Sequence, residues 1–198
     1  AASAKLLGAM LLDARDSDLA RLALDPAPGA AIDVLFTTAL GKTSGRTRLG
    51  VINSIARRRI ETAVTALIGL LADKDAATAT AAARALGEIA TPAAAAALRS
   101  AKAPAPGILG HARLQATHRL PVADAQRLLR ELQDDTGLPA HLRAGAFRRS
   151  LDLDPSTAAT RIVQLLSGND WTFKQAALEA LAGSLKPGDV AALPAKLS

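Results

Sequence analysis

The sequence contains no cysteine and very few aromatic residues. Without cysteine the chain can form no disulfide, no thiolate zinc site and no cysteine nucleophile. Aromatic residues make up only 2% of the 198 residues, with three phenylalanines, one tryptophan and no tyrosine. The hydrophobic fraction of 49% therefore consists mostly of alanine, leucine, isoleucine and valine, a composition that suits closely packed helices.

Long apolar runs and a leader sequence are also missing. No stretch of about 18 apolar residues occurs, so the sequence predicts no membrane-spanning helix. The chain begins with Ala1 instead of methionine, and no charged-then-apolar leader follows. We therefore expect a processed or excerpted chain that is soluble, and the sequence leaves both a cytoplasmic and an exported location open.

A helical pattern recurs with a period of about 31 residues, which is typical of a helical repeat. Apolar residues lie three, four, seven and eight positions after Arg48, which is the spacing of one face of an α-helix. The same pattern follows Ala79 and Lys174, and a looser copy follows Arg143. Arg48 and Ala79 are 31 residues apart, and so are Arg143 and Lys174. About twice this separation lies between Ala79 and Arg143. This regularity predicts a repeated first helix.

A second helix is predicted after each first helix. Its central apolar residue recurs with nearly the same period, at Phe36, Leu67, Leu98, Leu128 and Ile162. The unit over 105–133 is the weakest, since its first helix fits a starting point at either Leu109 or Arg113. With about one and a half further units before the first of these helices, the sequence predicts about six helical pairs and no β-strand.

Polar residues mark the predicted helix starts. Asp75 and Asp170 each lie four residues before a first-helix starting point, where a carboxylate can accept the unpaired N–H groups of the first turn. Asp154 and Thr91 are each followed by proline, which is favoured at the first helical position. These four residues are predicted N-caps.

The segment from Ala30 to Ser100 resembles the HEAT-like repeat family, including repeats first described in phycobilisome lyases. The resemblance rests on RLGVINSIARRR (48–59), LLADKD (70–75) and AAARALGEIATP (81–92). It implies an ARM/HEAT-type α-solenoid, a right-handed α-α superhelix forming a single domain over 1–198, similar to bacterial HEAT-repeat proteins. It implies a scaffold with second helices on the concave side, and no lyase activity, because the motif is structural.

The resemblance also implies a break in one regular interaction. The arginine that usually stands at the first-helix anchor of this family is replaced by Ala79 in the best-matching unit. We therefore expect any ladder of Arg–Asp pairs between repeats to be interrupted there.

No residue pattern predicts a metal or cofactor site. His111, His118 and His141 have no neighbouring glutamate, so they are expected to be exposed or capping residues instead of metal ligands. No glycine motif for phosphate occurs. Gly50 and Gly87 fall within predicted helices, where we expect them to permit close packing.

Carboxylates offer no convincing catalytic arrangement either. Asp152 and Asp154 flank a helix junction, where capping is favoured over catalysis by a carboxylate pair. Asp170 and Trp171 invite comparison with HEAT-like DNA glycosylases, which use an aromatic cleft with a carboxylate. Only Phe173 lies near this single tryptophan, whereas a base-stacking pocket needs several aromatic planes. We predict that Asp170 is an N-cap, that Trp171 packs in the first helical turn, and that the protein is not an enzyme.

The net charge of +6 is unevenly distributed. The segments Lys42–Arg59 and Arg99–Arg119 contain six and four basic residues and no acidic residue. A solvated basic face is the favoured interpretation, and an acidic partner or a nucleic-acid backbone is the alternative.

The predicted second helices change character along the chain. Positions expected to face the concave side are small and apolar in the N-terminal half, whereas the C-terminal half carries Arg127, Arg130 and Arg161. These arginines are the predicted partner-binding residues, since guanidinium groups can grip carboxylates bidentately. The alternative is that they pair with Glu131, Asp134 or Asp135 and bind nothing.

The sequence thus favours a non-catalytic interaction scaffold that binds a protein or peptide partner, with an acidic partner among the options. The alternative is non-specific binding of nucleic acid, and a relative of the DNA glycosylases is less favoured. No cofactor is predicted, and the oligomeric state stays open.

Overall fold

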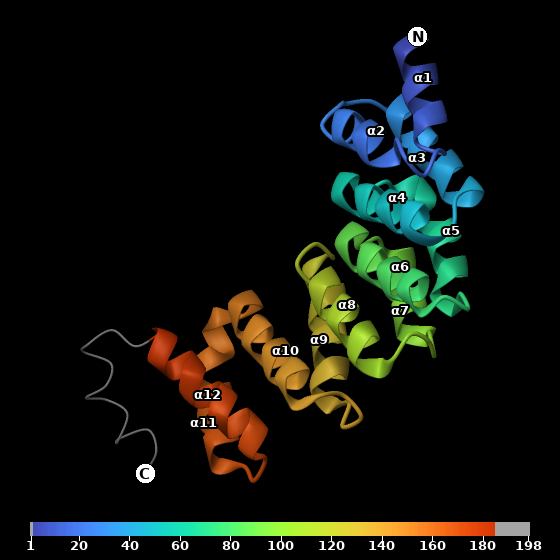
Figure 1. The fold of residues 1–198 in the computed structure, drawn as a ribbon. Helices are drawn as coiled ribbons and strands as arrows, with labels where there is room; N and C mark the ends of the chain where they lie inside the picture. The colour runs from blue at the N-terminus through green and yellow to red at the C-terminus, as the bar shows by residue number, and fades with distance from the viewer. Residues whose placement is uncertain (1, 185–198) are drawn as a thin grey trace. The chain divides into compact units, whose positions relative to one another are not determined.

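The computed structural model describes residues 2–184 and is all-α over that range, as predicted from the repeat (Figure 1). The α-helices in chain order are α1 (Ala2–Met10), α2 (Ser17–Leu24), α3 (Ala30–Lys42), α4 (Gly45–Arg58), α5 (Val64–Gly69), α6 (Ala76–Ile89), α7 (Pro92–Ser100), α8 (Pro106–Ala116), α9 (Val122–Asp134), α10 (Ala140–Leu153), α11 (Pro155–Ser167) and α12 (Trp171–Ser184). Two short 3-10 helices, η1 (Glu61–Ala63) and η2 (Leu70–Ala72), extend α5 at its two ends.

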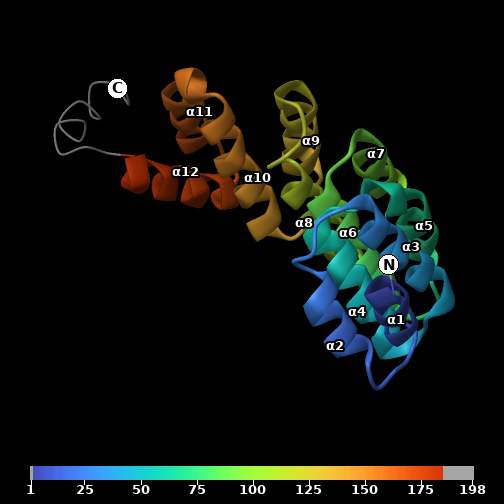
Figure 2. The ribbon, with the colours of Figure 1, turned by 90° about the horizontal axis from the view of Figure 1, so that it is seen from above.

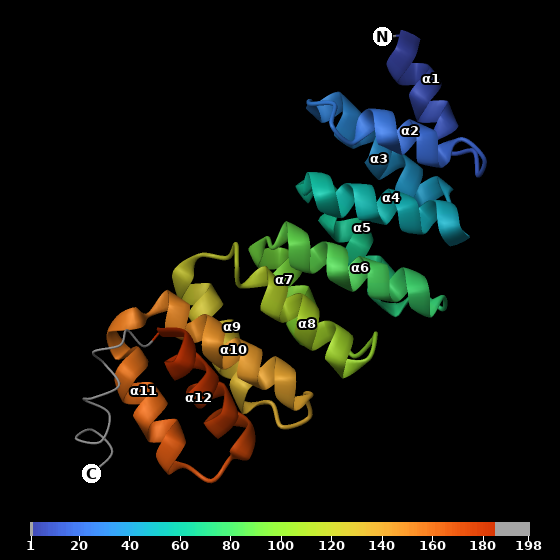
Figure 3. The same ribbon diagram turned by 60° about the vertical axis from the view of Figure 1, so that its left-hand side comes forward.

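The chain divides into two compact units, residues 1–120 and the part from Pro121 onward. In unit 1 the first helices α2, α4, α6 and α8 pack one against the next (Figures 1 and 3). The shorter second helices α5 and α7 pack against α6, and α3 packs against α4. In unit 2, α10 packs against both α9 and α12, and α11 packs against α12 (Figure 2). A single domain over 1–198 stays a prediction.

The helix register settles the choice that the sequence left open. Successive first helices keep the predicted period, with starts at Gly45, Ala76, Pro106, Ala140 and Trp171. In four of them the fourth residue is the predicted starting point of the pattern: Arg48, Ala79, Arg143 and Lys174. In α8 the fourth residue is Leu109, which is buried. Leu109 is therefore the anchor of this repeat, and Arg113 lies one turn further along the helix.

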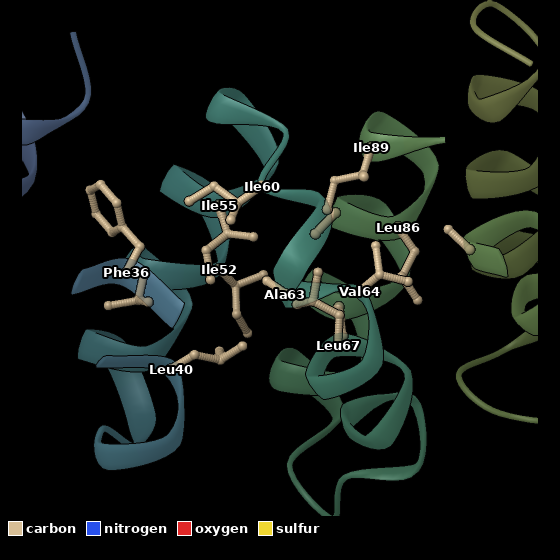
Figure 4. Packing of buried hydrophobic residues seen from close by; sticks show 14 of the residues in the cluster. Phe36, Leu40, Ile52, Ile55, Ile60, Ala63, Val64, Leu67, Leu86 and Ile89 are labelled. Carbon is tan, nitrogen blue, oxygen red and sulfur yellow. The ribbon is translucent and has the colours of Figure 1, made fainter. Parts of the chain in front are cut away.

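The predicted central residues of the second helices form the core. All five are buried, namely Phe36, Leu67, Leu98, Leu128 and Ile162. In unit 1 they join a continuous hydrophobic cluster with first-helix residues such as Ile52 and Leu86 (Figure 4). In unit 2, Ile162 packs in a smaller cluster with Phe147. Within each unit, the helices thus bury their apolar faces against their neighbours, as expected for repeats.

Three of the four predicted N-caps accept hydrogen bonds from the backbone. The Asp75 carboxylate accepts from the N–H groups of Ala77 and Thr78 at 3.2 and 3.3 Å. Thr91 Oγ1 accepts from the Ala94 N–H at 3.2 Å, and Asp170 Oδ1 accepts from the Thr172 N–H at 2.9 Å. These predictions are confirmed.

Asp154 occupies the predicted N-cap position of α11, but its carboxylate has different partners. It accepts from the hydroxyl groups of Ser156 and Thr157 at 2.6 and 2.8 Å, and no side-chain cap bond to the backbone is formed. The predicted N-cap position of Asp154 is confirmed, and proline stands at the first helical position as expected.

Both glycines inside first helices allow a close approach, as expected. A Cβ atom at Gly87 would lie 2.6 Å from the backbone carbonyl oxygen of Ala112 in α8. A Cβ atom at Gly50 would lie 2.7 Å from the guanidinium carbon of Arg21. At Gly87 the obstacle is backbone, so the contact between α6 and α8 requires glycine.

Gly87→Ala is expected to destabilise the protein by about 1–3 kcal/mol, because the added methyl group forces α6 and α8 apart. Gly41→Ala is the matched control, since it also lies in a helix and a Cβ atom there meets nothing within 4 Å. The control should stabilise the protein by about 0.5–1 kcal/mol. Urea denaturation measures both, and a stabilising Gly87→Ala would contradict this packing.

Asp75→Ala is expected to lower the melting temperature at neutral pH. Hydrogen bonds from the Thr78 hydroxyl and the Ala77 N–H lower the pKa of the Asp75 carboxyl below its ordinary value of 3.8. A lowered folded-state pKa stabilises the fold above the unfolded-state value, and that stabilisation is lost as the pH falls through the folded-state pKa. The difference in melting temperature between the variant and the unmodified protein should therefore shrink as the pH falls below the ordinary carboxyl pKa of 3.8. Asp75→Asn, which still caps, is the control.

Candidate functional site

The basic segment Lys42–Arg59 is largely neutralised by aspartates from other helices and loops. Four of its six basic residues form ion pairs, Arg46 with Asp18 at 3.5 Å, Arg48 with Asp73 at 3.4 Å, Arg57 with Asp25 at 2.6 Å and Arg58 with Asp33 at 2.7 Å. These partners could not be recognised from the composition of the segment, because all four aspartates lie outside Lys42–Arg59 in the sequence.

Arg58 is the most highly connected residue of this group. Its Nη1 donates to the backbone carbonyls of Leu24, Asp25 and Ala27 at 3.0, 2.8 and 2.6 Å. Its guanidinium carbon also lies 5.7 Å from the centroid of the Phe36 ring. Only 10% of the Arg58 side chain is exposed. This arginine therefore fastens the loop between α2 and α3 and is not available to a partner.

Unit 2 contains a pocket of about 320 Å³ with two arginines, which we call the arginine pocket. Its lining comes from α9, α10, α11 and the junction between α10 and α11, and consists of Gln126, Arg130, Ser150, Asp154, Thr157 and Arg161. Two of the three predicted partner-binding residues, Arg130 of α9 and Arg161 of α11, are thereby brought together from successive second helices.

Arg161 is held in place within this pocket. Its Nη2 donates to Ser150 Oγ at 2.8 Å and to Gln133 Oε1 at 3.4 Å. Its guanidinium carbon lies 5.5 Å from the centroid of the Phe147 ring. Among the described residues no carboxylate forms an ion pair with Arg161, so its charge is positioned by neutral groups.

Arg130 and Arg127 are more exposed. Arg130 lines the pocket and forms no ion pair within residues 2–184. Arg127 lies outside the lining, and its Nη1 is 3.9 Å from Asp124 Oδ1 on the same helix. The partner of Arg127 is thus Asp124, and not one of the three acidic residues considered from the sequence.

Asp154 adds a negative charge to the same pocket. Hydrogen bonds from the Ser156 hydroxyl and then the Thr157 hydroxyl lower the pKa of its carboxyl below the ordinary value. Asp154 is therefore ionised at neutral pH and sets an acidic group beside Arg130 and Arg161.

Trp171 does not pack in the first turn of α12, so this prediction was wrong. Its side chain is 73% exposed. Phe173 packs there instead, with its ring centroid 6.1 Å from that of Phe147 in an edge-to-face arrangement. The Arg143 guanidinium carbon lies 4.8 Å from the Phe173 ring centroid, while Nη2 of Arg143 donates to Asp170 at 3.2 Å. Asp170 thus caps the N-terminus of α12 and also forms an ion pair with Arg143.

The remaining candidate groups are the three histidines, Asp152 and Asp154. His111, His118 and His141 are exposed, as predicted. Asp152 lies 3.7 Å from Arg149, while Asp154 is bound by hydroxyl groups. In the part of the chain that the structure describes, no three histidine or acidic side chains form a group that could hold a metal ion. No helix in that part is both long and apolar enough to cross a membrane.

A family model for HEAT repeats matches residues 32–117. This segment is similar to HEAT repeats. No curated protein and no solved structure gives a significant match to the chain. The matched HEAT repeats run from α3 to α8 within unit 1, whereas α9 to α12 keep the helix spacing without a match of their own.

The Arg–Asp interaction of the HEAT repeats is interrupted, as expected. Arg48 Nε donates to the Thr43 carbonyl at 2.6 Å, and Arg48 Nη1 donates to Asp73 Oδ2 at 3.4 Å. Arg143 repeats this arrangement in unit 2, with the Gln133 carbonyl at 2.9 Å and Asp170 at 3.2 Å. The equivalent anchors between them are Ala79 and Leu109, whose apolar side chains cannot form this pair.

Arg58→Ala is expected to destabilise the protein by about 3 kcal/mol, because three loop carbonyls and Asp33 lose a nearly buried charged donor. Arg46→Ala is the control, since the Arg46 side chain is 92% exposed and forms one ion pair with Asp18, which is itself 60% exposed. That change should cost less than about 1 kcal/mol. Urea denaturation separates the two, and equal costs would contradict the role of Arg58.

Proposed function

We propose that this chain is a non-catalytic interaction scaffold that binds a protein or peptide partner, with an acidic side chain of the partner held in the arginine pocket. The observation that carries the proposal is the convergence of Arg130 and Arg161 on one open pocket without a carboxylate pairing either of them among the described residues. HEAT repeats supply extended surfaces for partners, which supports the scaffold role.

The state of Arg161 supports recognition of a carboxylate. Ser150, Gln133 and Phe147 already hold its guanidinium group, so little conformational entropy would be lost on binding. Nη2 is used by these contacts, while Nε and Nη1 keep their N–H donors. Nη1 can therefore donate a single charge-assisted hydrogen bond to a carboxylate of the partner. Arg130 adds a second charge, and Arg127 adds one at the margin.

The charges around the pocket favour a peptide over nucleic acid. Asp154 stays ionised, which reduces the net charge of the lining and disfavours a polyanion. In unit 1, four of the six cations of Lys42–Arg59 are paired with aspartates. A phosphate backbone needs many unpaired cations along one surface. Non-specific binding of nucleic acid is therefore the less favoured function.

The test is fluorescence anisotropy with a labelled hexaglutamate peptide. Changing Arg127, Arg130 and Arg161 together to alanine should weaken binding by about tenfold or more, since charge-assisted bonds are lost. Asp154→Asn should strengthen binding by about threefold, because it removes from the pocket lining a charge of the same sign as the ligand. Circular dichroism checks that the helical content is unchanged.

The control is the simultaneous change of Lys42, Arg46 and Arg84 to alanine, which removes the same charge from exposed positions in unit 1. It should leave hexaglutamate binding unchanged. Equal losses in both triple variants would mean that only net charge matters, and would contradict the pocket. A labelled DNA duplex that binds more tightly than hexaglutamate, with salt-sensitive affinity, would favour the nucleic-acid function instead.

A further inference from the structure

The arginine pocket contains charges of both signs that do not pair with one another. Asp154 and Arg161 are partly buried in its lining, and Arg130 is exposed at its surface. Among the described residues, no ion pair or hydrogen bond joins the Asp154 carboxylate to either guanidinium group. The positive and negative charges are therefore held apart within one pocket, and each can meet a charge of a ligand.

Neutral groups hold Asp154 in place, as they do Arg161. Oδ1 of Asp154 accepts from the Ser156 hydroxyl at 2.6 Å, and Oδ2 accepts from the Thr157 hydroxyl at 2.8 Å. A carboxylate offers about four acceptor positions, so each oxygen keeps room for a further donor. The same hydroxyl groups lower the pKa of this carboxyl, which keeps it charged at neutral pH. The pocket thus presents a positioned negative charge that can still accept hydrogen bonds.

The repeat makes this acidic group an addition to an otherwise duplicated arrangement. Gln126 and Arg130 of α9 lie 31 residues before Thr157 and Arg161 of α11, so equivalent positions of two successive second helices line the pocket. The position that is equivalent to Asp154 is Ala123, which carries no charge. The negative charge is therefore confined to one end of the pocket, at the junction between α10 and α11.

This charge arrangement selects among ligands. A purely acidic segment is attracted by the two arginines but repelled by Asp154, and a purely basic segment meets the reverse. A neutral segment leaves all three charges without a partner. Only a segment with both charges close together pairs favourably with both ends of the pocket, and repulsion of the wrong charge then contributes to specificity.

We propose, building on the proposed function, that the arginine pocket binds a partner segment in which an acidic residue stands next to a lysine. The carboxylate of the segment binds Arg130 and Arg161, and its ammonium group binds Asp154. Lysine suits the second position because its ammonium is a compact charge with three donors on a flexible stem. It can bind a single oxygen of Asp154, whereas a planar guanidinium group binds best to two free oxygens.

The test compares two labelled, end-blocked hexapeptides by fluorescence anisotropy, one alternating glutamate with lysine and one alternating glutamate with glutamine. Both carry the same carboxylates. Because the protein has a net charge of +6, net charge alone predicts tighter binding of the glutamate–glutamine peptide. We expect the glutamate–lysine peptide to bind about threefold more tightly instead, through its additional ion pair. Equal or weaker binding of the glutamate–lysine peptide overturns the inference.

Asp154→Asn should reverse this preference. It should weaken binding of the glutamate–lysine peptide by about threefold and strengthen binding of the glutamate–glutamine peptide. Asp154→Glu keeps the charge and should keep the preference. Asp152→Asn is the matched control, since Asp152 is 68% exposed and lies outside the lining, and it should leave the preference unchanged. An equal gain for both peptides in Asp154→Asn, or an equal effect of Asp152→Asn, overturns the inference.

The inference and the proposed function fail in different ways. The triple alanine variant of Arg127, Arg130 and Arg161 should weaken binding of both peptides, because both place a carboxylate against the arginines. If neither peptide is weakened, the proposed function fails and this inference fails with it. If both are weakened but the preference survives in Asp154→Asn, only the role of Asp154 in recognising a lysine is overturned.

Discussion

Burial of one apolar face of each helix pair against the next pair is the constraint on which the rest of this structure depends. A single pair cannot form a core, so the helices must approach closely enough for short side chains to meet. Alanine supplies much of the contact surface, and at Gly87 even a methyl group is too large for the backbone of α8. Such close contacts leave no space for a binding site inside the core. Candidate binding residues are therefore expected on the surface, at the edges of neighbouring helices.

Charge is used differently along the chain. Within the HEAT repeats of unit 1, arginines such as Arg58 and Arg48 bind loop carbonyls and aspartates contributed by neighbouring repeats. Their hydrogen bonds and ion pairs therefore connect helices and loops in addition to the apolar contacts. In unit 2, Arg161 is instead held by a hydroxyl, an amide and an aromatic ring, which position its charge without neutralising it. The type of partner, and not the number of basic residues, separates a structural arginine from a candidate binding arginine.

The helix pairs could be predicted from the sequence because their apolar pattern recurs with a period of about 31 residues. Three helix caps could be predicted because each depends on residues within about one turn of one another. The caps at Asp75 and Thr91 involve backbone groups two or three residues away. The ion pairs of Arg57 and Arg58 could not be predicted, since their aspartates belong to another repeat. Trp171 was misplaced for a related reason. Only the fold shows that Phe173, two residues later, is the aromatic side chain that packs against Phe147.

Phe147 connects the arginine pocket to the core of unit 2. The buried ring supports Arg161 on one side and meets Phe173 edge-on, so one side chain orients both the charge of the arginine pocket and the first turn of α12. Helix α10 uses different faces for packing and for the arginine pocket. It packs against α9 and α12, while its Ser150 lines the arginine pocket and accepts a hydrogen bond from Arg161 at 2.8 Å. The same helix that completes the core of unit 2 therefore also fixes the position of the candidate binding charge.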